Sequence, residues 1–228
     1  MSYGLVIFFD VDNTLLDNDA VYAGLHERTA AALGPARDKR FWQIYDEVRT
    51  TRDVVDIPAA VERFQAEFPN LAAAASLHRL VFDFPFAKVV FPSTPTAVAY
   101  AATLGLPAVL SDGDSRFQPH KITASGVRAL FDGRVVIREH KELEFEQVEQ
   151  LYPADHYVMV DDKPRIHRAL KARYGSAITT IMVCQGHYAA DDHDYHGADI
   201  VLEDIGEITK LAPEDIRERA SLIPSPGA

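Results

Sequence analysis

Near its start the chain reads Leu5-Val6-Ile7-Phe8-Phe9-Asp10-Val11-Asp12-Asn13-Thr14-Leu15. Five apolar residues in a row predict a strand that is buried on both of its faces. Two carboxylates, those of Asp10 and Asp12, follow this strand at once. Burying unpaired charge is costly, so the pair requires a metal ion, a hydrogen-bond network or open solvent. The stretch therefore predicts a charged site at the end of a core strand.

The rest of the chain divides into a helical part and an alternating part. Residues 19–84 read as helices with no strand pattern between them, and the first is expected to be capped by Asn18 or Asp19. From about residue 91, helices alternate with short apolar strands, which we expect at 106–110, 135–137, 156–160, 178–183 and 200–202. Such alternation is typical of crossover connections and a parallel sheet.

The sequence thus predicts an α/β fold: a Rossmann-like parallel sheet core into which an α-helical cap is inserted. We expect the core to comprise residues 1–17 and 91–215, and the helical cap to comprise residues 18–90. A C-terminal tail would follow at residues 216–228. This division rests on the change of pattern on either side of a helical insertion of about 70 residues.

Charge and cysteine content restrict the classes of function. The net charge of −11 argues against a general nucleic-acid or anionic-membrane binder, and any anionic substrate must be drawn in by a local positive site. One cysteine, Cys184, excludes an intramolecular disulfide framework and fits a reducing compartment. No signal-peptide pattern and no 18-residue apolar run is present, so a cytoplasmic location is expected.

Polar side chains follow several of the predicted strands. Because the carboxyl ends of parallel strands meet at one edge of a sheet, these side chains are expected to lie close together. They are the pairs Asp10 and Asp12, Asp161 and Asp162, the run Ser111-Asp112-Gly113, and Lys141. Carboxylates from two strands, Asp10 and Asp162 with Asp161 nearby, would form an oxygen-rich pocket that suits Mg²⁺.

The remaining groups suit the transfer of a phosphoryl group. Asp10 could attack phosphorus and form an aspartyl-phosphate, while Asp12 could protonate the leaving alcohol and then activate water. Hydroxyls of Ser111 and Thr14 and the main-chain amides near Asp112-Gly113 would bind phosphate oxygens. Lys141 would stabilise the negative charge that develops in the transition state.

These residues, in this order, resemble the four motifs of the haloacid dehalogenase-like hydrolase superfamily. The resemblance covers residues 4–18 and 91–208, and it places a helical cap between the first and second motifs. It implies that Asp10 is the nucleophile, that Asp12 is the general acid/base, and that Ser111 and Lys141 bind phosphate. It also implies metal ligation by Asp10, by the main-chain carbonyl of Asp12, and by the acidic pair Asp161 and Asp162.

Within the acidic pair, we expect Asp162 to be the direct metal ligand and Asp161 to support it. Members of the superfamily often carry another acid or amide a few residues after this pair, whereas this chain reads Lys163-Pro164-Arg165-Ile166-His167. Lys121 is a rival for the role of Lys141, but it lies close to Ser111 in the sequence and in a predicted helix.

For several other residues, a structural or solvent-exposed role is favoured over a role in binding or catalysis. The loop 186–196 contains three histidines but lacks the spacing that fixes a metal site, so it is interpreted as a solvated loop. Cys184 is expected to be a small core residue, and Trp42 and Tyr45 to pack within the cap. Arg28, Arg49 and Arg52 are expected to be solvated, with the alternative that one of them reaches the far end of the substrate.

Hydrolysis of a small phosphorylated metabolite is the predicted activity. A dehalogenase of the same superfamily usually lacks a second aspartate at the position of Asp12, and works without Mg²⁺. A phosphonate hydrolase requires a Schiff-base lysine in the cap, where only Lys39 and Lys88 occur. The remaining alternative is a non-enzymatic protein that binds phosphate on this scaffold.

Overall fold

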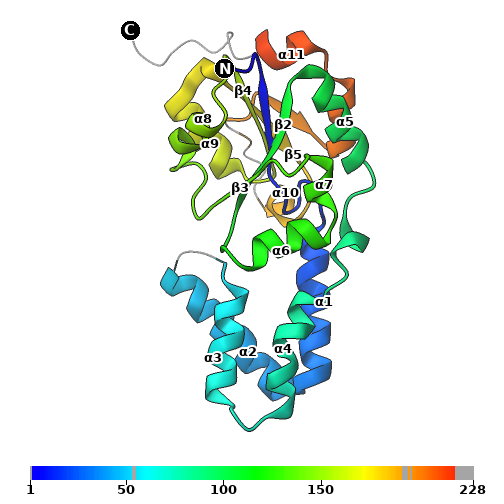
Figure 1. Cartoon of the computed structure of the whole chain (residues 1–228), viewed down its shortest axis with the longest axis vertical. Helices are drawn as coiled ribbons and strands as arrows, with labels where there is room; N and C mark the ends of the chain where they lie inside the picture. The colour runs from blue at the N-terminus through cyan, green and yellow to red at the C-terminus, as the bar shows by residue number, and fades with distance from the viewer. Residues whose placement is uncertain (1, 53–54, 192–194, 196, 219–228) are drawn as a thin grey trace.

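A single parallel sheet forms the centre of the protein (Figure 1). The computed structural model describes residues 2–52, 55–191, 195 and 197–218. Six strands of these residues form the sheet in the order β3-β2-β1-β4-β5-β6, and every neighbouring pair is parallel. The strands are β1 (Val6–Phe9), β2 (Leu106–Asp112), β3 (Val135–Arg138), β4 (Tyr157–Asp161), β5 (Ile178–Val183) and β6 (Ile200–Leu202). The predicted α/β class with a Rossmann-like parallel sheet is confirmed.

Strand β1 lies in the middle of the sheet, and its apolar residues pack alternately into two hydrophobic clusters, one on each face. Val6 and Phe8 pack on one face, while Ile7 and Phe9 pack on the other, and all four side chains are fully buried. A strand covered on both faces has no polar positions to alternate with the apolar ones. This explains why the sequence before Asp10 is continuously apolar.

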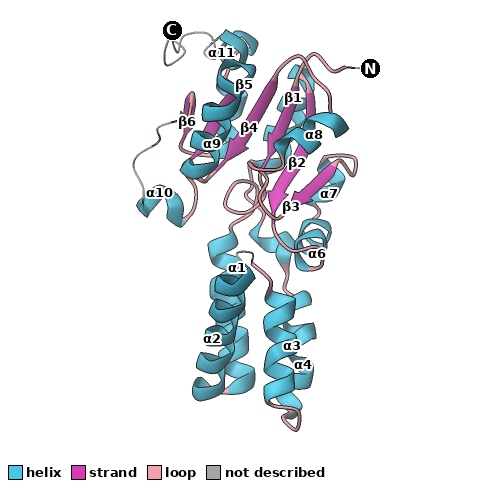
Figure 2. Ribbon diagram, turned by 90° about the vertical axis from the view of Figure 1, so that its left-hand side faces the viewer, coloured by secondary structure: helices cyan, strands magenta, loops and turns pink. Residues whose placement is uncertain are grey.

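Helices cover both faces of the sheet (Figure 2). Helices α8 (Phe145–Leu151) and α9 (Pro164–Tyr174) supply the apolar residues that pack against Val6 and Phe8. On the other face, the helices of the core are α5 (Thr94–Leu104), α6 (Phe117–Ala124), α7 (Val127–Leu130), α11 (Pro213–Glu218) and the 3₁₀ helix η3 (Ile205–Lys210). Two further short elements are α10 (His187–Asp191) and the 3₁₀ helix η2 (Gly175–Ala177).

A bundle of four helices follows β1 and precedes α5. We call it the helical insertion; it contains α1 (Asn18–Leu33), α2 (Pro35–Arg52), α3 (Ile57–Glu67) and α4 (Ala72–Phe82), and the 3₁₀ helix η1 (Phe86–Val89) follows. Each helix packs on its neighbours, with α4 returning to α1. Figure 2 shows the bundle beyond the carboxyl ends of the strands, so it faces the edge of the sheet where Asp10 lies.

Two chain segments connect the helical insertion to the core, and they lie side by side. The amide of Asp17 donates to the carbonyl of Val89 (2.8 Å), and the amide of Phe91 donates to that of Leu15 (3.0 Å). The hydroxyl of Thr94 donates to the same Leu15 carbonyl (2.7 Å). Hydrogen bonds therefore hold together the two segments that connect the core to the helical insertion.

Helix α1 begins one residue earlier than expected from its predicted cap. Asp17, and neither Asn18 nor Asp19, is the N-cap, since its carboxylate accepts the amide of Ala20 (2.8 Å). The amides of Asn18 and Asp19 donate instead to the side-chain carbonyl of Asn13 (2.9 and 3.2 Å). The predicted caps are thus wrong because two polar side chains upstream already satisfy the first turn.

The turn after β1 places Asn13 against the loop that follows β5. Asn13 has a φ of 56°, in the left-handed region that asparagine tolerates better than most residues. Gly186 also has a positive φ (79°), and a Cβ there would lie 2.4 Å from the Cγ of Asn13. A side chain at position 186 would therefore displace the turn that carries Asp12.

Several element boundaries differ from the predicted ones. The strand predicted at 106–110 continues through Ser111 and Asp112, because pairing with β3 extends to Arg138. The short helices α7, α10 and α11 were not predicted, since four to six residues give no periodicity. Helix α11 extends past residue 215, and Ile216 is fully buried, so packed structure continues into the predicted tail 216–228.

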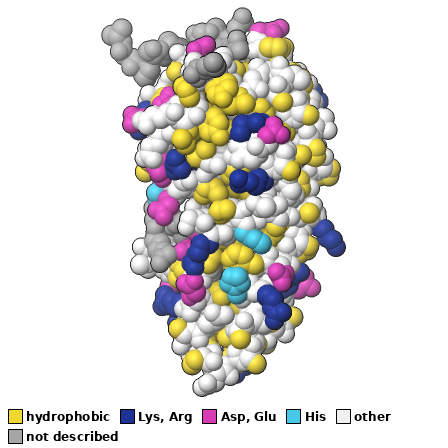
Figure 3. All heavy atoms as spheres, viewed as in Figure 1, with side chains coloured by type: hydrophobic (Ala, Val, Ile, Leu, Met, Phe, Trp, Pro, Cys, Tyr) yellow, Lys and Arg dark blue, Asp and Glu magenta, His cyan; other side chains and the backbone are white. Residues whose placement is uncertain are grey.

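Charges of both signs are interspersed over the face shown in Figure 3, which uses the view of Figure 1. The excess of acidic residues therefore does not form one uniform patch on that face. Within the described part of the chain, no helix has the length and apolar character needed for a membrane crossing.

Candidate active site

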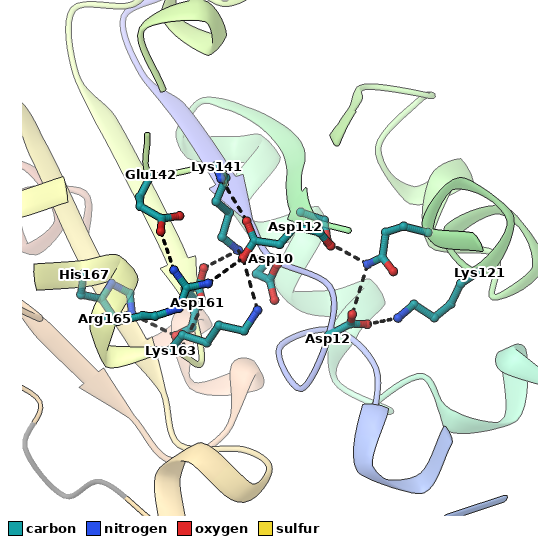
Figure 4. Close-up of polar contacts among 12 residues, drawn as sticks. Asp10, Asp12, Asp112, Lys121, Lys141, Glu142, Asp161, Lys163, Arg165 and His167 are labelled. Atoms are coloured by element: carbon teal, nitrogen blue, oxygen red, sulfur yellow. Dashed lines mark hydrogen bonds and ion pairs between the residues drawn. The ribbon is translucent and has the colours of Figure 1, made fainter. Parts of the chain in front are cut away.

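The carboxyl ends of β1 and β4 place Asp10 and Asp161 in direct contact with Lys141, which follows β3 (Figure 4). The ammonium of Lys141 lies 2.6 Å from Asp10 Oδ1 and 2.6 Å from Asp161 Oδ2. All three side chains are at most 1% exposed. One lysine between two carboxylates compensates much of the cost of burying the charges. The two strands that end here are direct neighbours, which explains why residues 151 positions apart meet.

The pKa values of these groups reflect burial and their neighbours. Burial raises the pKa of Asp10 to about 6, against the opposing effect of Lys141. Burial alone would lower the pKa of Lys141, but the carboxylates of Asp10 and Asp161 raise it overall. The lysine is therefore held in its charged form, as a group that stabilises negative charge must be.

Asp10, Asp161 and Asp162 form a cluster that fits a divalent cation. One carboxylate oxygen from each lies within 4.8 Å of the other two. Among the described residues, Asp10 Oδ2 and both oxygens of Asp162 have no hydrogen-bond partner, although they are buried. Burial also raises the pKa of Asp162 well above its ordinary value. Buried carboxylate oxygens without partners are the donor set that Mg²⁺ prefers.

Within this cluster, the two adjacent aspartates have different surroundings. Asp161 Oδ1 accepts the amide of Lys163 (2.9 Å), and Asp161 Oδ2, although it accepts no hydrogen bond from the described residues, lies 2.6 Å from the ammonium of Lys141. Asp162 has both oxygens available and lines the cavity described below. This difference favours Asp162 as a direct ligand and Asp161 as its support, which remains a prediction.

Asp12 lies in a separate polar group that is built by helix α6. Lys121 places its ammonium 2.5 Å from Asp12 Oδ1, and the side-chain amide of Gln118 donates to Asp12 Oδ2 (3.2 Å). The same Gln118 amide donates to the hydroxyl of Ser111 (2.8 Å). Lys121 also donates to Asn18 Oδ1 (3.2 Å), at the start of the helical insertion. Asp12 is therefore held by two side chains that lie one helical turn apart.

Lys121 and Gln118 are site residues that the sequence analysis missed. Lys121 was considered only as a rival for Lys141, and the structure shows two lysines with two different aspartates. A signal was available in the sequence, since Gln118 and Lys121 share one face of a helix at i, i+3 spacing. Both are buried, at 4% and 3% exposure, and buried polar side chains require partners.

The other predicted phosphate ligands differ in whether their polar groups already have hydrogen-bond partners. The hydroxyl of Thr14 is buried, and among the described residues it has no partner. The amide of Gly113 donates to the carbonyl of Arg138 (3.0 Å) as part of the β2–β3 pairing. The Gly113 amide is therefore already paired because the sheet extends further than expected, and phosphate binding by the main-chain amides near Asp112-Gly113 stays a prediction.

The carboxylate of Asp112 is surrounded by cationic side chains. Its Oδ1 accepts the amide of Lys141 (3.1 Å), while Oδ2 lies 3.4 Å from Lys163 and 3.3 Å from Arg165. Burial would raise the pKa of Asp112, but Lys141, Lys163 and Arg165 hold it below its ordinary value. The Asp112 carboxylate thus fixes the loop that carries Lys141.

A cavity of about 890 Å³ separates the strand ends from the helical insertion. This volume is in the range of sites for small organic ligands. On the core side its lining includes Asp12, Asp112, Asp162, Lys121 and Lys163. On the insertion side it includes Tyr22, His26, Trp42, Tyr45 and Arg49.

The aromatic wall of this cavity is also packed structure. The hydroxyls of Tyr22 and Tyr45 share a hydrogen bond (2.5 Å), and the indole N–H of Trp42 donates to the hydroxyl of Thr29 (3.1 Å). Trp42 and Tyr45 are 9% and 5% exposed. The prediction that both residues pack within the helices is confirmed, and the same rings also border the cavity.

The three arginines of the insertion differ in position. Arg28 donates to the carbonyls of Leu80 and Asp83, which ties α1 to the end of α4. Arg49 is exposed and lines the cavity, so it is the one placed to reach a substrate. The side chain of Arg52 lies outside the described part of the chain.

The histidine-containing loop reaches this region through His187, which contacts Asp19 and lines the cavity. The imidazole Nδ1 of His187 lies 2.6 Å from Asp19 Oδ1, and the His187 amide donates to Asp19 Oδ2 (2.8 Å). Residues 192–194 and 196, which include the other two histidines, lie outside the described residues. Cys184 is half-buried, and burial raises its pKa.

Comparison with known proteins identifies the family to which this fold and this chain belong. The model of the haloacid dehalogenase-like hydrolase family matches residues 5–174. The chain is 39% identical to a haloacid dehalogenase-like hydrolase from Burkholderia xenovorans LB400, over 93% of this chain and 98% of that one, with a TM-score of 0.86. The chain belongs to the haloacid dehalogenase-like hydrolase family.

Other solved structures of the family share the fold at lower identity. A haloacid dehalogenase-like hydrolase from Xanthomonas campestris is 16% identical, over 96% of this chain and 94% of that one, with a TM-score of 0.67. The 2-haloacid dehalogenase from Pseudomonas syringae pv. tomato DC3000 is 15% identical, over 91% and 97%, with a TM-score of 0.66. None of the curated proteins compared with this chain matches it. Membership of the family is therefore established, and the reaction must be argued from the site.

Proposed function

We propose that this hydrolase is a Mg²⁺-dependent phosphatase that acts on a small phosphorylated metabolite through an aspartyl-phosphate on Asp10. The observation that carries the proposal is the second carboxylate, Asp12, which lines the cavity and is separate from the cluster around Asp10. An alkoxide leaving group requires a proton, whereas a halide leaves as a stable anion. An acid that faces the substrate cavity is thus useful for a phosphate ester and unnecessary for a haloacid.

Asp10 would act as the nucleophile. Its Oδ1 is bound by Lys141, while Oδ2 has no partner among the described residues and can attack phosphorus. As the Oδ2–P bond forms, the bond from phosphorus to the leaving oxygen breaks, and Asp12 gives its proton to that oxygen. Asp12 then takes a proton from water, which attacks the aspartyl-phosphate and releases phosphate with Asp10 restored.

The cation and the two lysines would stabilise the charge that develops. Asp10, Asp162 and the carbonyl of Asp12 would hold Mg²⁺, with Asp161 in support; the bound ion supplies charge neutralisation at the phosphoryl oxygens. Lys141 is buried and charged beside Asp10, and Thr14 and Ser111 bring hydroxyls from the same strand ends. Lys121 and Gln118 keep Asp12 oriented toward the cavity.

The phosphonate-hydrolase alternative has less support. Lys39 and Lys88 are exposed, and neither is among the described residues that line the cavity. A Schiff-base lysine would have to reach the substrate from the insertion, and these two do not border its site.

The proposal is tested by hydrolysis of p-nitrophenyl phosphate with and without Mg²⁺, beside chloride release from 2-chloropropionate. We expect Mg²⁺-dependent phosphate release that is lost in Asp10→Asn, and no chloride release. Metal-independent chloride release without phosphatase activity would establish the dehalogenase instead. Wild-type turnover no greater than that of Asp10→Asn, across a panel of phosphorylated metabolites, would leave only the non-enzymatic interpretation.

A further inference from the structure

Lys163 follows the two aspartates of the cation cluster directly, and its side chain lies in the same charged group. Its ammonium is 3.4 Å from Asp112 Oδ2, and the side chain is 16% exposed. Both Lys163 and Asp162 line the cavity. Figure 4 shows the Lys163 side chain running toward Asp112 and Asp10 rather than out to solvent.

The backbone holds this lysine in one place. The amide of Lys163 donates to Asp161 Oδ1 (2.9 Å), and Pro164 restricts the residue before it to an extended conformation. Lys163 has that conformation, with φ −103° and ψ 110°, at the N-terminus of α9. The direction of the side chain is therefore set by the same strand end that sets Asp161 and Asp162.

The net charge of the cluster matches the charge of one divalent cation. When the four carboxylates of Asp10, Asp112, Asp161 and Asp162 are all ionised, as they are around a bound cation, they face the two ammonium groups of Lys141 and Lys163, which leaves two negative charges. At the rim, Arg165 pairs with both Glu142 and Asp112, and the added charges of Arg165 and Glu142 sum to zero. Without Lys163, three negative charges would remain beside the cation.

We propose that Lys163 is a built-in counter-ion of the cation cluster, which stabilises the metal-free protein and weakens its affinity for Mg²⁺. The inference rests on the proposed use of Mg²⁺ at this site. A fixed positive charge next to the ligands repels the incoming ion, and it lowers the repulsion among carboxylates when the ion is absent. Both effects favour a site that binds and releases the cation readily.

The test is isothermal titration of MgCl₂ into the full-length wild-type protein and into Lys163→Met, Lys163→Gln and Lys163→Arg. We expect Lys163→Met and Lys163→Gln to bind Mg²⁺ about tenfold more tightly than the wild type, because one nearby positive charge is removed. Lys163→Arg keeps the charge and should bind within about threefold of the wild type. Arg173→Met is the matched control, since it removes an exposed cation of the same helix α9 that pairs with Glu146 and does not line the cavity, and should change the affinity less than about threefold.

Thermal unfolding gives a second readout that does not depend on turnover. The metal-free Lys163→Met protein should melt below the metal-free wild type, and saturating Mg²⁺ should raise its Tm by more than it raises that of the wild type. Unchanged or weaker Mg²⁺ binding by both neutral variants, with normal binding by the wild type, would overturn this inference alone. Absence of Mg²⁺ binding in every variant would overturn the proposed metal dependence and this inference together.

Discussion

The α/β core and the helical insertion use charge in opposite ways. In the core, Lys141 and its two carboxylate partners are at most 1% exposed and lie at the strand ends. In the insertion, Arg40 pairs with Glu47 and Glu67 on the outer surface, with 30–42% of each side chain exposed, while aromatic rings face the cavity. The contrast indicates that the buried Lys141 group would serve the proposed chemistry, whereas the exposed Arg40 pairs serve the stability of the bundle.

The largest effect is expected from Lys141→Met. This change leaves Asp10 and Asp161 buried without their shared partner, so we expect a loss of about 3–5 kcal/mol in the free energy of unfolding. It also removes the charge that stabilises the transition state, and kcat should fall about 10²–10³-fold. Denaturant unfolding and p-nitrophenyl phosphate kinetics measure the two effects.

Lys171→Met is the matched control for that change. Lys171 lies 2.8 Å from the buried carboxylate of Asp199, and neither residue lines the cavity. It should destabilise the protein through the same mechanism while each folded molecule keeps its kcat. An equal loss of kcat in both variants would show that the Lys141 effect is one of folding, and would break the contrast drawn above.

Lys121→Met is expected to have the next largest effect. Asp12 would lose its nearest partner and its orientation, so proton transfer to the leaving group should suffer. We expect kcat to fall about 10²-fold for an alkyl phosphate, and much less for p-nitrophenyl phosphate, whose leaving group needs no proton. Lys210→Met, at an exposed lysine, is the control. Equal losses for both substrates would mean that Lys121 has no role in that proton transfer.

The fold and part of the site follow from the sequence for a physical reason. Asp10, Ser111, Lys141 and Asp161 could be grouped in advance because parallel strands end at one edge of a sheet, so that strand order along the chain implies proximity. Lys121 and Gln118 could not be grouped in this way. They reach Asp12 because α6 lies across the end of the sheet, and the orientation of a helix is set by packing that strand positions do not encode.

The partner of the Gly113 amide and the N-cap of α1 could not be predicted from the sequence for a related physical reason. In both places a main-chain amide was assigned without knowing which acceptor would reach it first. The carbonyl of Arg138 satisfies the Gly113 amide, and the side chains of Asn13 and Asp17 satisfy the first turn of α1. Such pairings depend on strand length and turn geometry rather than on residue type.

Tyr45→Phe tests the insertion side of the comparison. It keeps the ring beside Trp42 but removes the hydroxyl that bonds Tyr22, so we expect a loss of about 0.5–1.5 kcal/mol in the free energy of unfolding. The Kd for Mg²⁺ should not change, since the hydrogen bonds and ion pairs that the described residues make to the carboxylates of Asp10 and Asp161 come from the core residues Lys141 and Lys163. A changed Mg²⁺ affinity in calorimetry would show that the helical insertion influences cation binding by the core.

Arg40→Met should have the smallest effect. Hydrogen bonds from Arg40 lower the pKa of both Glu47 and Glu67 in the folded protein. A lowered carboxyl pKa adds stability above the ordinary value of 4.5, and this stability is lost as the pH falls through the folded pKa. We therefore expect a Tm difference from the wild type of about 1–3 °C at pH 7 that shrinks below pH 4. Arg37→Met, on the same helix, is the control; a difference that grows toward low pH would contradict this explanation.

The central claim is that Asp10 becomes phosphorylated during turnover. The protein is mixed with p-nitrophenyl phosphate and Mg²⁺, quenched in acid within the first turnovers, digested, and analysed by mass spectrometry. We expect the peptide containing Asp10 to gain the mass of one phosphoryl group, and this gain to be absent in Asp10→Asn. Steady phosphate release by the wild type, with no phosphoryl group on that peptide at any quench time, would contradict it.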